Sequence, residues 1–256
     1  MESINIGLLS AMPEEIGSTI ENLENVSLKE YGDLKIYYGK LKKKVPNYES
    51  VFITLAWSGW GKVSAARAIT RILAGTNKID LIIFTGVAGA ANKNLNQWDI
   101  VIANEVIQHD MDARPIFEKF VLPPLKKAKL ESDNFLKNWI FNSLKKSIKN
   151  GNLKGFGNIK KGLIATGDSF ISDKSIIKSL KDELSNLEAI EMEGGAVAQV
   201  AEQEGIPWII VRVISDKADS NSEIDFDQFL KDYVLISWKL LDCILQDIPK
   251  IKNNLI

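Results

Sequence analysis

The stretch AIEMEGGAV, residues 189–197, joins an apolar segment to a run of small residues. Such a change predicts a buried strand that runs directly into a helix. Two carboxylates, Glu191 and Glu193, flank Met192 at this junction. Because a carboxylate is costly to bury unless another group pairs with it, the junction predicts a polar site at the end of a strand.

Segments of the same two kinds recur along the whole chain. Apolar runs predict strands at residues 4–9, 35–41, 51–57, 81–84, 98–107, 162–166, 189–192 and 207–214. Helical spacing of apolar residues predicts helices at residues 62–73, 194–204 and 226–248. The small residues 85–90 after one strand predict a loop. Apolar strands that alternate with helices predict an α/β fold with a mixed, largely parallel sheet covered on both faces.

The composition is that of an ordinary globular protein. The chain has 256 residues, 45% of them hydrophobic, and we expect a single domain over residues 1–256. The lysine-rich residues 112–161 predict an inserted or extended segment with one helix near residues 135–144. The 32 basic and 33 acidic residues nearly cancel, so the net charge favours neither a nucleic-acid partner nor a membrane partner.

Several site classes are disfavoured by single residues. Cys243 is the only cysteine and His109 the only histidine, so neither an intrachain disulfide nor a histidine-based metal cluster is possible. We expect a buried thiol at Cys243, a structural, hydrogen-bonding side chain at His109, and no metal or cofactor. The N-terminal residues lack the pattern of a signal peptide, and no apolar run approaches the ~20 residues of a membrane span, so we expect a cytoplasmic protein.

Three acids follow predicted strands next to glycine or serine: Glu15, Glu193 and Asp216. Each alone has an ordinary explanation, as a first-turn helix acid, an ion-pair partner or a helix cap. Open α/β sheets, however, bind ligands at the carboxyl ends of their strands. The three acids together therefore predict one shared site.

A site with three acids and no metal cluster suits the hydrolysis of a glycosyl bond. This reaction needs an acid for the leaving group and a base for the attacking water. A third carboxylate can accept hydrogen bonds from sugar hydroxyls.

Seven stretches carry a resemblance to a known family. They are IGLLSAMPEEI (6–16), SGWGKVSAA (58–66), TGVAGA (85–90), WDIVIANEVIQHD (98–110), GLIATGDSFI (162–171), AIEMEGGAVAQVA (189–201) and VRVISDKAD (211–219). The chain resembles the 5′-methylthioadenosine/S-adenosylhomocysteine nucleosidases, within the superfamily of purine nucleoside and uridine phosphorylases. The resemblance implies a three-layer α/β/α sandwich that binds an adenine nucleoside. It also implies a homodimer, in which the partner completes the 5′ pocket with a segment near residues 113–117.

The resemblance implies a role for each matching site residue. Glu15 is expected to activate the attacking water. Asp216, aligned by Ser215, is expected to protonate N7 of the purine and bind its exocyclic amine. Glu193 is expected to accept hydrogen bonds from the ribose hydroxyls. The other substrate-binding residues implied are Trp60 and Phe226 on the 5′ side, Phe170 and Ile171 at the base, Met192 at the sugar, and Ala88, Gly89, Glu191 and Arg212.

Water is favoured over phosphate as the nucleophile. Phe84 and Val87 stand at two positions where hexameric bacterial phosphorylases carry Arg and Ser. Two acids at residues 14–15 would also repel a phosphate dianion. A phosphorylase, a hydrolase of another adenine nucleoside and a non-catalytic nucleoside-binding protein remain alternatives. The 5′ group stays open because Trp60 replaces a smaller aliphatic residue of the family.

Overall fold

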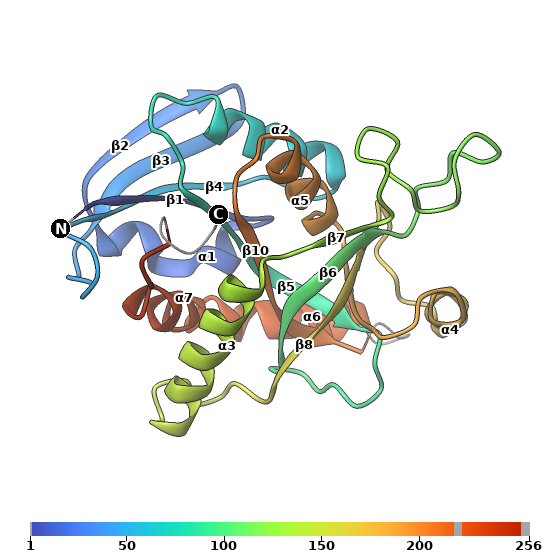
Figure 1. Cartoon of the computed structure of the whole chain (residues 1–256). Helices are drawn as coiled ribbons and strands as arrows, with labels where there is room; N and C mark the ends of the chain where they lie inside the picture. The colour runs from blue at the N-terminus through green and yellow to red at the C-terminus, as the bar shows by residue number, and fades with distance from the viewer. Residues whose placement is uncertain (1, 218–221, 252–256) are drawn as a thin grey trace.

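The structure is a computed structural model that describes residues 2–217 and 222–251 (Figure 1). Its strands are β1 (Ile4–Ser10), β2 (Leu23–Tyr31), β3 (Leu34–Leu41), β4 (Val51–Trp57), β5 (Leu81–Ala90), β6 (Ile100–Gln108), β7 (Lys129–Glu131), β8 (Ile159–Thr166), β9 (Leu187–Glu191) and β10 (Trp208–Asp216). Its helices are α1 (Pro13–Ile16), the 3-10 helix η1 (Gly17–Asn22), α2 (Lys62–Leu73), α3 (Asn134–Lys149), α4 (Lys174–Glu183), α5 (Gly194–Gln203), α6 (Ser222–Tyr233) and α7 (Ser237–Gln246).

The strands form one mixed sheet in the order β10-β6-β8-β9-β5-β1-β4-β3-β2, with β7 on β6. Because β10 also pairs with β5, the strands β5, β10, β6, β8 and β9 form a closed circuit, from which the other strands extend. Among the described residues, five pairings are parallel and five antiparallel. The sheet is mixed as predicted, but the predicted parallel majority is not confirmed, because hairpin-type neighbours such as β2–β3 and β3–β4 contribute antiparallel ladders.

Helices pack on both faces of this sheet (Figure 1). One apolar cluster joins α2 and α5 to the sheet, and includes Ala65 and Ile69 of α2 and Val197 of α5. The other cluster joins α3, α6 and α7 to the opposite face. Strand β1 is buried on both sides, since Leu8 belongs to one cluster and Leu9 to the other. The α/β prediction is therefore confirmed.

Two predicted elements differ from the structure. Residues 85–90 are not a loop but continue β5, because Thr85 to Gly89 pair with β10. Residues 226–248 form two helices rather than one. The amide groups of Leu235 and Ile236 bond three residues back instead of four, which tightens the end of α6 before α7 begins.

Other parts of the chain add detail to the predictions. Residues 112–161 contain β7, α3 and the start of β8, so this segment supplies one short strand and the beginning of another as well as the predicted helix. The end of the VRVISDKAD stretch, residues 218–219, lies outside the described residues. In the described part of the chain, no helix has both the length and the apolar character needed to cross a bilayer.

Candidate active site

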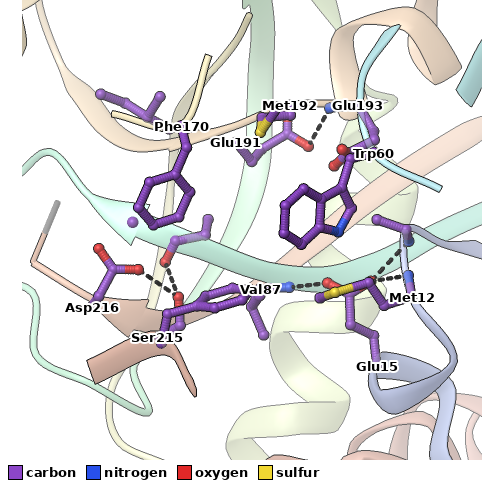
Figure 2. Close-up of a pocket in the computed structure, with 15 residues that line it drawn as sticks. Met12, Glu15, Trp60, Val87, Phe170, Glu191, Met192, Glu193, Ser215 and Asp216 are labelled. Atoms are coloured by element: carbon purple, nitrogen blue, oxygen red, sulfur yellow. Dashed lines mark hydrogen bonds between the residues drawn. The ribbon is translucent and has the colours of Figure 1, made fainter. Parts of the chain in front are cut away.

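One pocket opens where the carboxyl ends of β1, β4, β5, β9 and β10 meet (Figure 2). Its empty volume of about 460 Å³ lies in the range of small-molecule sites. The pocket is lined by Ala11, Met12, Glu15, Trp60, Val87, Ala88, Gly89, Phe170, Ile190, Glu191, Met192, Glu193, Ser215, Asp216 and Phe226. The structure thus brings together eleven of the thirteen predicted site residues, while Ile171 lines an adjoining cavity and Arg212 lies buried behind the wall.

Glu15 projects from the short helix α1 and is 1% exposed. Its carboxylate accepts hydrogen bonds from the backbone N–H groups of Ala11 (2.8 Å), Met12 (2.9 Å) and Val87 (2.8 Å). Pro13 supplies the first helical position, so Glu15 can reach back to the N-cap amide as in a capping box. Burial raises the pKa of Glu15, although Arg212 and the three amides act in the opposite direction. The result is a fixed carboxylate with an increased affinity for a proton.

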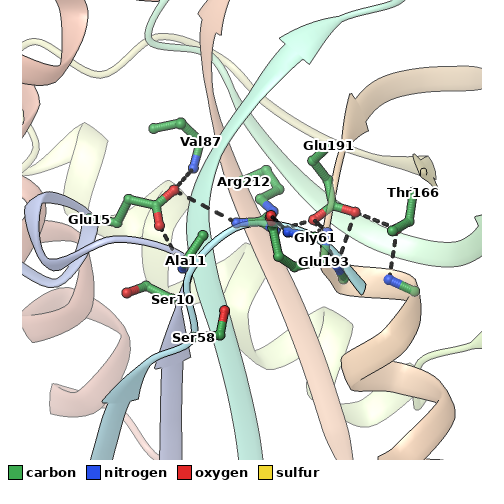
Figure 3. A network of polar contacts seen from close by, with 12 residues as sticks. Ser10, Ala11, Glu15, Ser58, Gly61, Val87, Thr166, Glu191, Glu193 and Arg212 are labelled. Atoms are coloured by element: carbon green, nitrogen blue, oxygen red, sulfur yellow. Dashed lines mark hydrogen bonds and ion pairs between the residues drawn. The ribbon is translucent and has the colours of Figure 1, made fainter. Parts of the chain in front are cut away.

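Arg212, at 0% exposure on β10, stands among three buried carboxylates (Figure 3). Its Nη2 pairs with Glu191 and lies 3.5 Å from Glu193, while its Nη1 lies 4.0 Å from Glu15. The guanidinium also covers the ring of Phe84, 4.2 Å from the ring centroid. A single cation therefore faces three anions in a region with little water, which favours retention of a proton by one of the acids.

The two glutamates of AIEMEGGAV have different surroundings. Glu191 accepts hydrogen bonds from the amides of Glu193 and Gly194 and from the hydroxyl of Thr166. Glu193 accepts one from the amide of Gly61 at 2.9 Å and a long one from Arg212 at 3.5 Å. Burial and the neighbouring Glu191 charge raise the pKa of Glu193 to about 8. Glu191 thus holds the start of α5 and pairs with Arg212, whereas the raised pKa of Glu193 favours its protonated form, and both side chains line the pocket.

The opposite end of the pocket contains Asp216, which is 4% exposed. The hydroxyl of Ser215 donates a hydrogen bond to its carboxylate at 2.7 Å. Phe170, Ile171 and Gly89 line the adjoining cavity here. A cavity that places an aromatic ring and aliphatic side chains beside the carboxyl group of Asp216 suits a heterocyclic base that carries a protonatable nitrogen.

Three aromatic rings form one wall of the pocket. Phe226 packs edge to face against Trp60, with ring centroids 6.4 Å apart, and against Phe170, with ring centroids 5.9 Å apart. Trp60 remains 56% exposed and Phe170 45% exposed. Because both apolar side chains are this exposed to solvent at the mouth of the pocket, they are available for contact with a ligand or a second chain.

Sequence reasoning missed some groups of the site. The backbone amides of Val87 and Gly61 hold Glu15 and Glu193, and backbone donors leave no signature in a side-chain pattern. Thr166, whose hydroxyl donates to Glu191, was also missed. It lies in one of the seven matching stretches, and its position at the end of a predicted strand could have indicated a site residue. The predicted hydrogen bonding of His109 is not confirmed for Nε2, which is buried without a partner among the described residues. Across those residues no three His, Cys, Asp or Glu side chains are arranged to hold a metal ion.

Comparisons with known proteins agree with this geometry. The Phosphorylase superfamily matches residues 5–245. The 5′-methylthioadenosine/S-adenosylhomocysteine nucleosidase of Glaesserella parasuis serovar 5 is 34% identical over 228 residues, which cover 89% of this chain and 92% of that protein. A structure of the Neisseria meningitidis nucleosidase in complex with methylthio-immucillin-A is 31% identical with a TM-score of 0.83, covering 94% of this chain and 98% of that one. The structure of futalosine hydrolase of Helicobacter pylori strain 26695 is 28% identical with a TM-score of 0.80, and the match covers 94% of this chain and 97% of that one.

The matches extend over nearly the whole chain and include both sequence and fold. They confirm the resemblance carried by the motifs and the nucleoside phosphorylase-like α/β fold. The chain therefore belongs to the 5′-methylthioadenosine/S-adenosylhomocysteine nucleosidase family of the phosphorylase superfamily.

Proposed function

We propose that this protein hydrolyses the N-glycosidic bond of 5′-methylthioadenosine, and of S-adenosylhomocysteine, to release adenine. The observation that carries the proposal is the placement of two buried carboxylates, Glu15 and Asp216, in one pocket of nucleoside size. Their hydrogen-bond partners differ, as the roles of base and acid require.

Glu15 is the base in this mechanism. Three backbone amides and the distant charge of Arg212 hold its carboxylate in one orientation, and burial makes it a stronger base than an exposed glutamate. It takes a proton from the attacking water as the water approaches the anomeric carbon of the ribose.

Asp216 is the acid at the base end. With Ser215 fixing the carboxyl group at 2.7 Å, Asp216 donates a proton to N7 of the purine and accepts a hydrogen bond from the exocyclic amine. Protonation lets adenine leave as a neutral molecule, which removes charge from the leaving group.

The other predicted residues bind the substrate between these two acids. Glu193, fixed by the amide of Gly61, faces the ribose hydroxyls. The base stacks on Phe170 and contacts the backbone of Ile171, while the remaining lining residues are Ala88, Gly89 and Met192, with Phe226 and Trp60 at the 5′ group.

Water is the nucleophile in this proposal because none of the described residues that line the pocket is a cation that could bind phosphate. Arg212 is the buried cation nearest the pocket, and three carboxylates already surround it. Phe84 lies under its guanidinium. A phosphate dianion beside Glu15 would be repelled.

We also propose the finer features that the family resemblance implies. The chain is one domain with a three-layer α/β/α arrangement and acts in the cytoplasm. It works as a homodimer whose partner closes the 5′ end of the pocket. The exposed apolar side chains of Val63 (82%) and Ile116 (83%) support this assembly.

The test is adenine release from 5′-methylthioadenosine with and without phosphate, followed by identification of the sugar. Phosphate-independent release of free methylthioribose is expected. Release that requires phosphate and yields a sugar 1-phosphate would establish a phosphorylase instead. A parallel assay with S-adenosylhomocysteine and futalosine identifies the 5′ group, and turnover of futalosine alone would replace the proposed substrate.

A further inference from the structure

Lys62, the first residue of α2, takes part in a ring of three hydrogen bonds outside the proposed catalytic groups. Its Nζ donates to Asp110 at 2.6 Å, and Asp110 accepts from the amide of Asp168 at 3.0 Å. The carboxylate of Asp168 in turn accepts from the amide of Lys62 at 2.8 Å. These bonds join the turn after β4, the end of β6 and the loop after β8.

The ring also completes the start of α2. Gly61 is the N-cap and has no side chain to accept a hydrogen bond from the first turn. Asp168 supplies the missing acceptor from a different loop, and its charge suits the positive end of the helix dipole. Lys62 Nζ, 3.7 Å from Asp168, adds charge attraction within the ring.

The loop after Asp168 is fixed between its ends mainly by Ile171, which is 8% exposed in the apolar cluster beside α4. Residues 169–172 carry two walls of the base end, Phe170 and Ile171. Within the described part of the chain, these four residues make no hydrogen bond, and the loop is held at its two ends, by Asp168 and by Asp173 as the N-cap of α4. Phe170 is 45% exposed, so packing alone fixes it weakly.

We propose that Lys62 and Asp110 form a latch, acting through Asp168, that positions the Phe170 loop for binding of the base. The description of Phe170 as a wall for adenine rests on the function proposed above. Lys62 and Asp110 are positioning residues, because neither lines the pocket.

The surroundings make this ion pair stronger than a typical surface pair. The side chain of Lys62 is 18% exposed and that of Asp110 33% exposed, so solvent screens them only partly. Burial raises the pKa of Asp110, but the hydrogen bond and charge of Lys62 outweigh it and leave that pKa below its ordinary value. Asp110 is therefore ionised at neutral pH.

The experiment compares Lys62→Met and Asp110→Asn with the wild type. Lys62→Arg tests for rescue, and Lys40→Met removes a more exposed ion pair, Lys40–Glu24, on the distant β2–β3 hairpin as a matched control. For each variant, calorimetry gives the Kd of adenine, and kinetics give KM and kcat for 5′-methylthioadenosine.

Loss of the latch should weaken adenine binding by about five- to tenfold. This lies at the lower end of the loss in affinity expected when a base loses its stacking on an aromatic ring. KM should rise in parallel while kcat stays within about twofold, as for an interaction lost equally from ground and transition states. Lys62→Arg should restore most of the affinity and Lys40→Met should leave it unchanged. Adding Lys62→Met to Phe170→Ala should cause no further loss, since both changes act on one ring.

Other results would overturn the latch. Unchanged adenine affinity with a lower melting temperature would make Lys62 a structural residue only, and a fall in kcat at unchanged affinity would place its effect on the chemical step. Additive losses of adenine affinity in the double variant would show that Lys62 does not act on adenine binding through Phe170. A wild type that binds adenine without turning over 5′-methylthioadenosine would refute the proposed function while leaving the adenine test valid, and a wild type that binds no adenine would refute both.

Discussion

Arg212 faces three buried carboxylates, and this imbalance sets the protonation of the site. With all three acids ionised, the buried cluster would carry an excess of negative charge. Burial and the neighbouring Glu191 raise the pKa of Glu193 to about 8, which favours the protonated form of this carboxyl group at neutral pH. The neutral carboxyl group can then both donate to and accept from the two ribose hydroxyls.

The protonation of Glu193 gives a pH dependence of stability. Its pKa is about 8 in the folded protein against 4.5 as the ordinary value, so the folded state binds more protons between these pH values. Stability contributed by this group is full below pH 4.5 and is lost as the pH rises through about 8. Between pH 5 and pH 8.5 we expect the melting temperature of the wild type to fall relative to that of Glu193→Gln. The fall should be about 2–4 °C for each kcal/mol of unfolding free energy that is lost. A constant difference in melting temperature between the two proteins across this range would contradict the assignment.

The two catalytic assignments predict large losses of rate while the fold is retained. Asp216→Asn and Glu15→Gln should each lower kcat by about 10²- to 10⁴-fold, the range of a single general acid or base. Because burial raises the pKa of Glu15, activity should fall on acidification at a pH above 4.5. Steady-state kinetics across pH, with circular dichroism as the folding control, checks both. A variant with full activity would remove its residue from the mechanism.

Strand β5 passes so close to the site that one glycine on it has no room for a side chain. A Cβ on Gly86 would lie 2.3 Å from Arg212 Nη1 and 2.3 Å from Glu15 Oε1. Gly86→Ala must displace one of these groups, and we expect kcat/KM to fall by about 100-fold, as for a catalytic group misplaced by 1 Å.

Gly205→Ala is the matched control for this substitution. Gly205 has a φ of +66° and open space at the Cβ position. Its replacement should cost about 1 kcal/mol of stability from backbone strain and leave kcat/KM unchanged. If both variants kept full activity, the contact of β5 with the acids would have no catalytic importance.

The elements that carry the site could be predicted from the sequence because the spacing of their apolar residues and the small residues at their ends indicate the same element. The helix at residues 62–73 was predicted with its observed bounds, and the strand–helix junction at 189–197 was also found. Strand β2 gave no signal, since only Leu23 of its nine residues is buried. Helix α4 was missed although Ile176, Ile177 and Leu180 have helical spacing, because this short segment is otherwise polar. An exposed strand such as β2, in contrast, lacks the alternation of buried and exposed residues on which such predictions depend.

At the scale of the whole molecule, the closed circuit of strands could not be predicted. It depends on the pairing of β5 with β10, which are more than 100 residues apart in the chain. The three acids could be predicted to share a site because each follows a strand that ends at the same edge of the sheet. Their protonation could not, because it depends on which residues surround Arg212 in three dimensions.

The homodimer proposal concerns the surface beside the pocket. The contact between Lys62 and Asp110 places the start of α2 next to the segment after β6, and these regions carry the exposed side chains of Val63 and Ile116. We expect Ile116→Asp to shift the mass measured by light scattering from dimer to monomer and to raise KM. Val26→Asp, a similar change on β2, is the control and should leave the mass unchanged. A wild type that is monomeric at assay concentration would contradict the proposal.

The position of β10 has a consequence for how the protein is made. This strand lies between β5 and β6, yet it is the last strand of the chain. A ribosome that adds about 5–20 residues per second makes the chain from the end of β5 to the start of β10 in roughly 6–25 s. Throughout this interval the edge of β5 that β10 later covers has no partner, and an unpaired strand edge is prone to aggregation. We therefore expect newly made chains to depend on chaperones until residues 208–216 emerge and supply both the missing strand and Asp216, the proposed catalytic acid.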